Sequence, residues 1–254
     1  VSICNGNSIS MTANGANSYV WQPNSATTST VSVAPLVTTT YTVTGTSSFG
    51  CVNTATKLIT VNNCNLTLNL KLYIEGYYNG GGLMAPVRAN QGIGNSAVNV
   101  DFITIELHNP VSPFATVASS IVFLKTNGTA TATFTNVIPS SYYIVIKHRN
   151  AIKTWSALPI TTSLITNYDF TTSSNKAFGD NMTEVEPGVW AFYSGDISAD
   201  DNIDLLDLTV LENDINEFAF GFIETDINGD GNVDLLDSPI VENNLNQFIF
   251  SNHP

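Results

Sequence analysis

Two stretches decide how this sequence is interpreted: residues 226–237 read DINGDGNVDLLD, and residues 196–207 read DISADDNIDLLD. They belong to a longer duplication, in which residues 195–220 align without gaps on residues 225–250 with thirteen identities in twenty-six positions. A fixed period is the mark of a repeated structural unit. The sequence therefore predicts two copies of one small module between residues 195 and 254.

Oxygen-bearing side chains recur along the second copy at the spacing of a calcium loop. In such a loop, positions 1, 3, 5, 9 and 12 supply ligands, position 7 supplies a backbone carbonyl, and a glycine at position 6 allows a sharp turn. Calcium takes six to eight hard oxygen ligands, which one tight loop provides only when alternate residues point inward. The loop residues predicted to hold the second ion are Asp226, Asn228, Asp230, Asn232, Asp234 and Asp237.

The first copy keeps this spacing with two departures. Ser198 is a weaker ligand at position 3 than an asparagine, and Asp201 replaces the glycine of position 6, where aspartate tolerates a positive φ less well. The loop residues predicted to hold the first ion are Asp196, Ser198, Asp200, Asn202, Asp204 and Asp207. We therefore expect two Ca²⁺ ions, with the second loop as the stronger site. A lone match would equally suit a solvated turn, but two matches at one period favour calcium.

A short helix with apolar residues is expected after each loop. A calcium loop plus one helix, present twice, resembles the type I dockerin of cellulosomes. That family recognises its cohesin partner through loop positions 10 and 11, often a Ser-Thr pair. Here both pairs are Leu-Leu, at Leu205-Leu206 and Leu235-Leu236. The resemblance thus implies the calcium fold, while the sequence departs from the family at the residues that select a cohesin.

Residues 1–63 alternate between apolar and polar side chains in short runs separated by turn residues, which predicts a small β-sandwich. Three cysteines in a chain that looks extracellular predict one disulfide and one leftover thiol. The runs around Trp21 and Tyr41, with Gly50-Cys51, resemble the immunoglobulin/PKD-like repeats of large surface proteins of gliding bacteria. This resemblance implies that Cys4 pairs with Cys51; the alternative is that both are buried free thiols.

Residues 64–194 carry the same alternation, for example in 66–72, 103–107 and 142–146, without a competing helical stripe. The run from Asn127-Gly128-Thr129 to Val145 resembles the strand-turn-strand of transthyretin-like and collagen-adhesin B-type sandwiches. We therefore expect a mainly β chain. It would contain two β-sandwich (immunoglobulin-like) domains, at 1–63 and 64–194, followed by a small α dockerin-like module at 195–254.

The formal net charge of -13 arises from 8 Lys+Arg against 21 Asp+Glu, and fourteen of the acids lie from Asp196 onward. Such a chain lacks the basic surface that nucleic acid requires. No run of about 18 apolar residues is present, so no membrane-spanning segment is expected. Because Val1 enters directly on what looks like a first strand, we expect a mature or shortened piece of a longer chain.

Residues 70–76, 142–150 and 191–196, taken with the doubled loop, resemble the C-terminal region of secreted proteins of gliding bacteria that use the type 9 secretion system. The resemblance implies a sorting signal for protein transport, recognised by the outer-membrane translocon and its associated barrel protein. The immunoglobulin-like repeat would be passenger or spacer of an adhesin-like cell-surface protein. The alternative is a binding module, either a dockerin partner of a cohesin or a glycan-binding adhesin domain.

The remaining polar residues suggest no enzyme. The three histidines are scattered, without the spacing of a zinc site, and nothing selects a glycosidase pair among the acids. The residues considered for these roles are His108, His148, His253, Glu75, Asp101 and Glu106.

Two further clusters have open interpretations. Lys147-His148-Arg149 is either a solvated strand end, a contact for an acidic partner, or a segment that docks on the calcium module. Tyr77-Tyr78 and Trp155 either stack on a sugar or, more commonly, are buried in the sandwich.

Overall fold

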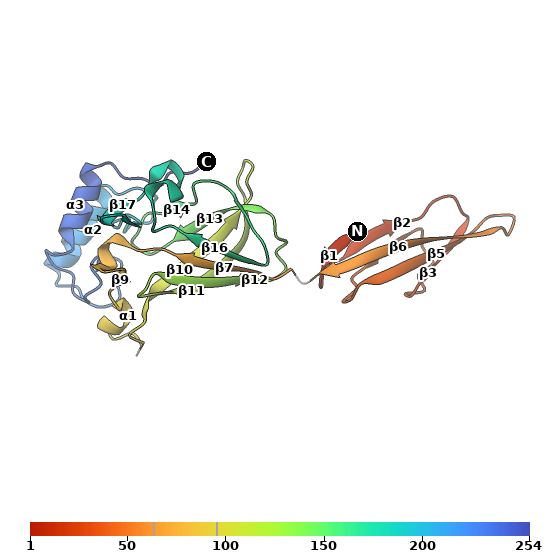
Figure 1. Cartoon of the computed structure of the whole chain (residues 1–254), viewed down its shortest axis with the longest axis horizontal. Helices are drawn as coiled ribbons and strands as arrows, with labels where there is room; N and C mark the ends of the chain where they lie inside the picture. The colour runs from red at the N-terminus through yellow and green to blue at the C-terminus, as the bar shows by residue number, and fades with distance from the viewer. Residues whose placement is uncertain (63, 95) are drawn as a thin grey trace. The chain divides into compact units, whose positions relative to one another are not determined.

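The computed structural model describes residues 1–62, 64–94 and 96–254. The chain is mainly β, with several sheets and few helices, as predicted (Figure 1). It divides into two compact units, one of Val1–Leu66 with Thr135–Ile138 and one of Thr67–Phe134 with Pro139–Pro254. Residue 63, the predicted end of the first segment, lies outside the described residues. Most of the predicted second sandwich and the whole predicted calcium module fall together in the second unit.

The first unit is built from two small sheets. A four-stranded sheet has the order β1-β6-β5-β3, and β2 pairs with β4. The strands are β1 (Ser2–Cys4), β2 (Ile9–Thr12), β3 (Ser18–Gln22), β4 (Thr30–Val33), β5 (Thr39–Thr46) and β6 (Val52–Asn62). The core is formed by Met11, Trp21, Val31, Val33, Tyr41 and Ile59. Alternate residues of β4 are buried, which is the period-2 pattern that the sequence displays.

The predicted disulfide between Cys4 and Cys51 is wrong, because Cys4 is bonded to Cys64. The cause is strand register. β1 runs parallel to β6 and sets Cys4 opposite Asn62, so the end of β6 lies beside Cys4. Cys51 precedes the start of that long strand and is an exposed free thiol. The Cα atoms of the bonded pair lie 5.4 Å apart, within the usual range.

The second unit contains two larger sheets and two β-ribbons. One sheet has the order β11-β10-β13-β14, with β15 also pairing β13, and the other has the order β12-β7-β16. The sheet strands are β7 (Leu66–Lys71), β10 (Asn99–His108), β11 (Thr116–Lys125), β12 (Thr129–Phe134), β13 (Ser141–Lys147), β14 (Thr154–Trp155), β15 (Ile160–Thr161) and β16 (Ile165–Asp169). The ribbons are β8 (Tyr78–Gly80) with β9 (Leu83–Met84), and β17 (Thr183–Glu186) with β18 (Val189–Ala191).

The two larger sheets supply the core of the sandwich, and β13 is buried on both faces from Tyr142 to Ile146. Alternate residues of β7 and β12 are buried, and so are Ile103, Ile105 and Leu107 of β10. Both patterns follow from the alternation of side chains along a strand.

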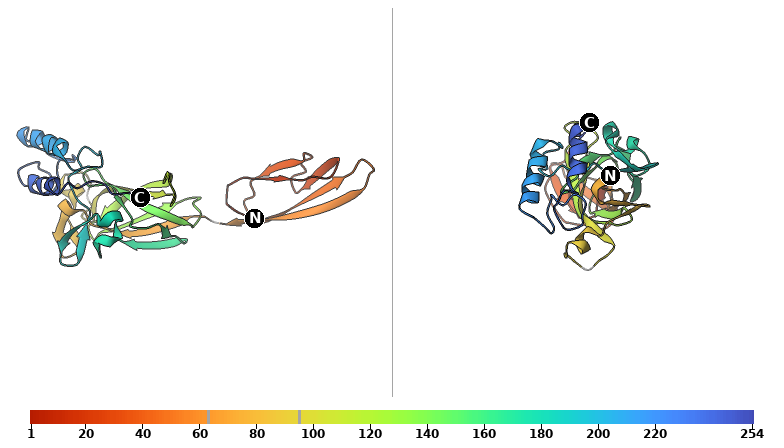
Figure 2. Two further views of the ribbon diagram at one scale, coloured as in Figure 1. Left: turned by 90° about the horizontal axis from the view of Figure 1, so that it is seen from above. Right: turned by 90° about the vertical axis from the view of Figure 1, so that its left-hand side faces the viewer.

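The helices are few and short. They are η1 (Glu75–Tyr77), α1 (Val87–Asn90), η2 (Ser174–Lys176), η3 (Phe178–Asp180), α2 (Leu205–Asn216) and α3 (Ser238–Asn246). In the duplicated segment, α2 and α3 lie side by side at one end of the second unit (Figures 1 and 2). Among the described residues, no helix has the length and apolar character needed to cross a membrane.

Candidate metal centre

The two predicted calcium loops fold in the same way, each around its last acidic residue. Asp207 Oδ1 accepts hydrogen bonds from the backbone N–H of Ile197 (2.9 Å) and Ser198 (2.8 Å), while Oδ2 accepts one from Asp204 (2.8 Å). Thirty residues later, Asp237 makes the same three bonds, with Ile227, Asn228 and Asp234. The carboxylate at position 12 thus joins the start of each loop to the residue at position 9.

The other loop carboxylates also accept hydrogen bonds from backbone N–H groups. Asp226 binds the N–H of Gly229 and Gly231, and Asp230 binds that of Asn232. Both copies share one further hydrogen bond, since Asp204 accepts from Leu206 and Asp234 from Leu236. α2 begins directly there, at Leu205, whereas α3 begins at Ser238, three residues later than the equivalent position. In the first copy, Asp204 and Asp207 form a full capping box.

Loop positions 2 and 8 anchor both loops in one apolar core. Ile197 and Ile227 occupy position 2, and Ile203 and Val233 occupy position 8; all four are buried. They pack with residues of α2, α3 and the sandwich: Leu211, Val241 and Ile152.

The two copies also interlock. Asn202, at position 7 of the first loop, pairs with Phe250 at the end of the second copy, while Phe220 at the end of the first copy pairs with Asn232. The copies therefore form one body, in which each loop is closed by the other copy.

The backbone differs between the loops at two positions. At position 6, Asp201 has φ 73° and Gly231 has φ 96°; at position 4, Ala199 has φ 56° and Gly229 has φ 76°. The second loop places glycine at both positions, and the first loop places a side chain at both. Since a left-handed conformation costs a residue with a Cβ about 1–2 kcal/mol, the first loop is the more strained. That it binds calcium less tightly stays a prediction.

The donor set suits a calcium ion. Asp196, Asp207, Asp226 and Asp237 are all at most 3% exposed, in a segment that holds no Lys or Arg between residues 195 and 254. Burial, followed by the charge of Asp207, raises the pKa of Asp196 to about 7. Burial likewise raises the pKa of Asp237 to about 6. Buried carboxylates without a cationic partner are costly, and a divalent ion with oxygen ligands would satisfy them.

The carboxylates are turned toward backbone N–H groups rather than toward a common centre. Across the described parts of the chain, no three or more His, Cys, Asp or Glu side chains gather as a metal site would gather them. The calcium assignment therefore rests on loop spacing, donor chemistry and the burial of the end carboxylates.

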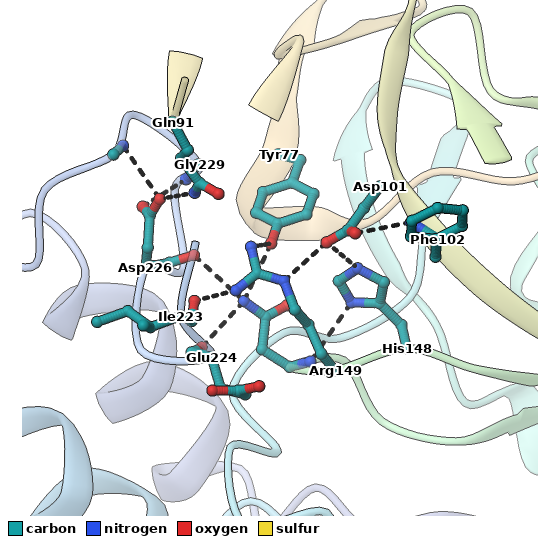
Figure 3. Close-up of polar contacts among 12 residues, drawn as sticks. Tyr77, Gln91, Asp101, Phe102, His148, Arg149, Ile223, Glu224, Asp226 and Gly229 are labelled. Carbon is teal, nitrogen blue, oxygen red and sulfur yellow. Dashed lines mark hydrogen bonds and ion pairs between the residues drawn. The ribbon is translucent and has the colours of Figure 1, made fainter. Parts of the chain in front are cut away.

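The second loop is braced by the sandwich through a buried polar network (Figure 3). Arg149 donates to the carbonyl of Ile223, to the hydroxyl of Tyr77 (2.7 Å) and to Asp101. Asn150 donates to the carbonyls of Glu224 (3.1 Å) and Asp226 (3.2 Å), which lead into the loop. Among the described residues, the first loop has a simpler brace, an ion pair between Lys153 and Asp201.

This network answers one question that the sequence left open. Of the basic cluster, Arg149 lies against the segment that enters the second loop, and Lys147 is paired with Glu106 instead. Sequence reasoning missed the roles of Tyr77, Gln91 and Asn150. The basic cluster is the sequence signal that points here, through the interpretation that it docks on the calcium module.

Two of the candidate acids pair with a candidate histidine, at two different places in the sandwich. Glu75 binds Asn244, Glu106 binds Lys147 and His108, and Asp101 binds Arg149 and His148. His253 contacts the ring of Trp155. Tyr77 and Trp155 are buried, as the commoner interpretation expected, and Tyr78 donates to Glu186.

Comparison with known proteins gives only distant likenesses. No protein-family model and no curated protein matches the chain. A chain from the type II cohesin–X-dockerin complex of Acetivibrio cellulolyticus is 14% identical with a TM-score of 0.44, over 72% of this chain and 97% of that one. The major pilin subunit of Bacillus cereus is 8% identical with a TM-score of 0.28, over 63% of this chain and 56% of that one.

Proposed function

We propose that this chain is a non-catalytic segment of a secreted cell-surface protein whose residues 195–254 form a calcium-stabilised, dockerin-like docking module. The observation that supports the proposal is a set of exposed apolar side chains that occurs at equivalent positions of both copies. Exposed fractions are between 52% and 84% in this set, which consists of Leu205, Leu206, Phe218, Phe220, Leu235, Leu236, Phe248 and Phe250. We name these eight residues the doubled apolar surface.

We infer that these repeated side chains together form a contact with another macromolecule, since large contiguous apolar patches on a folded protein mark such contacts. The leucine pairs occupy loop positions 10 and 11, beside ligand positions 9 and 12, so a bound ion would hold them in place. Residues 195–254 contain many Asp and Glu residues and no Lys or Arg, so the module around the leucine pairs is negatively charged. The doubled apolar surface therefore suits a partner whose binding surface is apolar at its centre and basic at its rim.

Calcium would act here as a structural ion. The loop carboxylates accept backbone hydrogen bonds that close the loops, and the ion would offset the repulsion between neighbouring acids. Metal binding and folding are then coupled.

The partner that we propose first is the outer-membrane translocon of type 9 secretion, with the chain acting as its export or sorting signal. The support for this partner is the resemblance of residues 66–254 to C-terminal regions of proteins exported by that system. The second candidate partner is a cohesin. Loop positions 10 and 11, through which dockerins contact cohesins, are exposed in both copies, although they carry Leu-Leu here in place of Ser-Thr.

One experiment tests the docking function and separates the partners. The full chain is fused behind a neutral reporter in a gliding bacterium, with Leu205, Leu206, Leu235 and Leu236 either intact or replaced by serine. Leu158→Ser, at a sandwich leucine that is 69% exposed, is the matched control. We expect surface delivery of the intact and control fusions and retention of the fourfold variant. Reporter retained in the periplasm by the intact chain would contradict export, and binding of purified cohesin would then favour the second candidate.

A further inference from the structure

The first ligand position of the second loop is held from outside the duplicated segment. Asp226 Oδ1 accepts a hydrogen bond from the N–H of Gly229 (2.9 Å). Asp226 Oδ2 accepts two, one from the N–H of Gly231 (3.0 Å) and one from Nε2 of Gln91. Figure 3 shows the Gln91 amide directed at this carboxylate. Its counterpart Asp196 accepts from the N–H of Asp200 (3.1 Å), and the described sandwich residues provide no side-chain donor to it.

Close packing places Gln91 in this position. Gln91 follows α1, and the preceding residue, Asn90, donates to the carbonyl of Gly229 (3.1 Å). A Cβ atom on Gly229 would lie 2.5 Å from Val87, and one on Gly231 would lie 3.4 Å from the carbonyl oxygen of Asn90. Glycine at position 229 therefore lets α1 approach the loop closely enough for the Gln91 amide to reach Asp226.

Only one orientation of the Gln91 side-chain amide fits the contact with Asp226. A carboxylate accepts hydrogen bonds and does not donate them, so the NH₂ group of Gln91 must face it. The other end of the amide, Oε1, is buried and makes no hydrogen bond within the described part of the chain. The contact with Asp226 is thus what fixes the Gln91 side chain. In turn, two donors on Oδ2 leave Oδ1, with a single donor, as the oxygen with more lone-pair capacity for an ion.

We propose that Gln91 is a positioning residue of the second calcium site, which presets the carboxylate of Asp226 before the ion arrives. Two features would then make the second loop the tighter calcium site: this contact from the sandwich, and the less strained backbone of the second loop. This inference rests on the proposed function, because it presupposes calcium in the loops. Partners that orient a metal ligand from outside the coordination sphere typically contribute about 10- to 100-fold in metal affinity.

The test is a calcium titration of the metal-free full chain by calorimetry. Asp200→Ala, at an exposed position 5 of the first loop, removes the first site so that the second is measured alone. In this background we compare Gln91→Ala with Gln22→Ala, the same change at an exposed glutamine of the first unit. We expect Gln91→Ala to weaken the second site by about 10-fold or more and Gln22→Ala to leave it unchanged.

A second arm separates positioning from general stability. In the Asp230→Ala background, which removes the second site instead, Gln91→Ala should leave the first-site affinity unchanged. If the wild-type chain binds calcium and Gln91→Ala leaves the second-site affinity unchanged, the positioning role is overturned but the proposed function is not. Equal weakening of both sites would also overturn it, since that indicates a global effect. Absence of calcium binding by the wild-type chain would instead overturn the proposed function.

Discussion

Asp101 and Arg149 form an ion pair of 2.7 Å between Oδ2 and Nε, although the Asp101 side chain is only 2% exposed. Asp101 lies on β10, and Arg149 follows β13 and reaches the carbonyl of Ile223 ahead of the second calcium loop. The guanidinium also lies 4.2 Å from the ring centroid of Phe222. Arg149 therefore links the sandwich to the duplicated segment through Ile223, and the buried ion pair with Asp101 fixes the guanidinium in this position.

Removing one partner of this pair should be costly. Arg149→Ala leaves the Asp101 carboxylate buried beside His148 alone and deletes the bonds to Tyr77 and Ile223. Breaking a buried ion pair typically costs about 3–5 kcal/mol. We expect a loss of this size in the free energy of unfolding of the second unit, measured by urea denaturation. Lys125→Ala, at an exposed lysine, is the control and should change the free energy little; an equal loss in both variants would contradict the role of Arg149.

The same pair predicts a pH dependence. Burial alone would raise the pKa of Asp101, but the hydrogen bond from His148 and the charges of His148 and Arg149 outweigh burial and lower the pKa. A carboxyl group whose pKa is lowered by folding adds stability above its unfolded pKa of about 3.9, and this stability is lost as the pH falls through the folded pKa. The stability difference between wild type and Asp101→Asn should thus be largest near neutral pH and narrow below about pH 4. Urea denaturation at several pH values measures it, and a constant difference would contradict the assignment.

The disulfide correction leads to a second stability prediction. Cys64→Ser should destabilise the first unit by about 4 kcal/mol, because the bridge closes a loop of 60 residues in the unfolded chain. Cys51→Ser, at the exposed free thiol, should leave stability unchanged. Peptide mapping of the oxidised chain should recover Cys4 linked to Cys64. A Cys4–Cys51 peptide, or equal destabilisation by both variants, would be incompatible with the structure.

The difference in backbone conformation between the loops can be tested with two opposite substitutions at loop position 4. Ala199→Gly removes a Cβ from a residue at φ 56° and should stabilise the first loop by about 1 kcal/mol. Gly229→Ala adds a Cβ at the equivalent position of the second loop, 2.5 Å from Val87, and should destabilise it. Thermal unfolding with calcium present measures both. Changes of the same sign in the two variants would show that the loops do not differ in this respect.

What the sequence predicts well here is local. The presence of a short helix after each loop depends on neighbours within about a dozen residues, and α2 and α3 follow the two loops as expected. The disulfide was mispredicted because its partner depends on the register of β1 against β6, two strands far apart in sequence.

The sequence indicated the brace on the second loop only in part, since docking of Lys147-His148-Arg149 on the calcium module was one of three open interpretations and the individual contacts were not predicted. Gln91 and Asp226 are separated by 135 residues, and Arg149 and Ile223 by 74. Neither contact has a local pattern, since a glutamine after a short helix and an arginine after a strand are common. Only the three-dimensional packing of α1 and β13 against the loop brings them together.

The central claim is that the two loops hold calcium and that the ions stabilise the duplicated segment. Calorimetric titration of the metal-free full chain tests it most directly, combined with amide hydrogen exchange with and without chelator. We predict two ions per chain, the tighter one at the second loop, and loss of exchange protection in residues 195–254 on chelation while residues 1–62 keep theirs. No heat of calcium binding, with exchange protection identical with and without chelator, would contradict the claim.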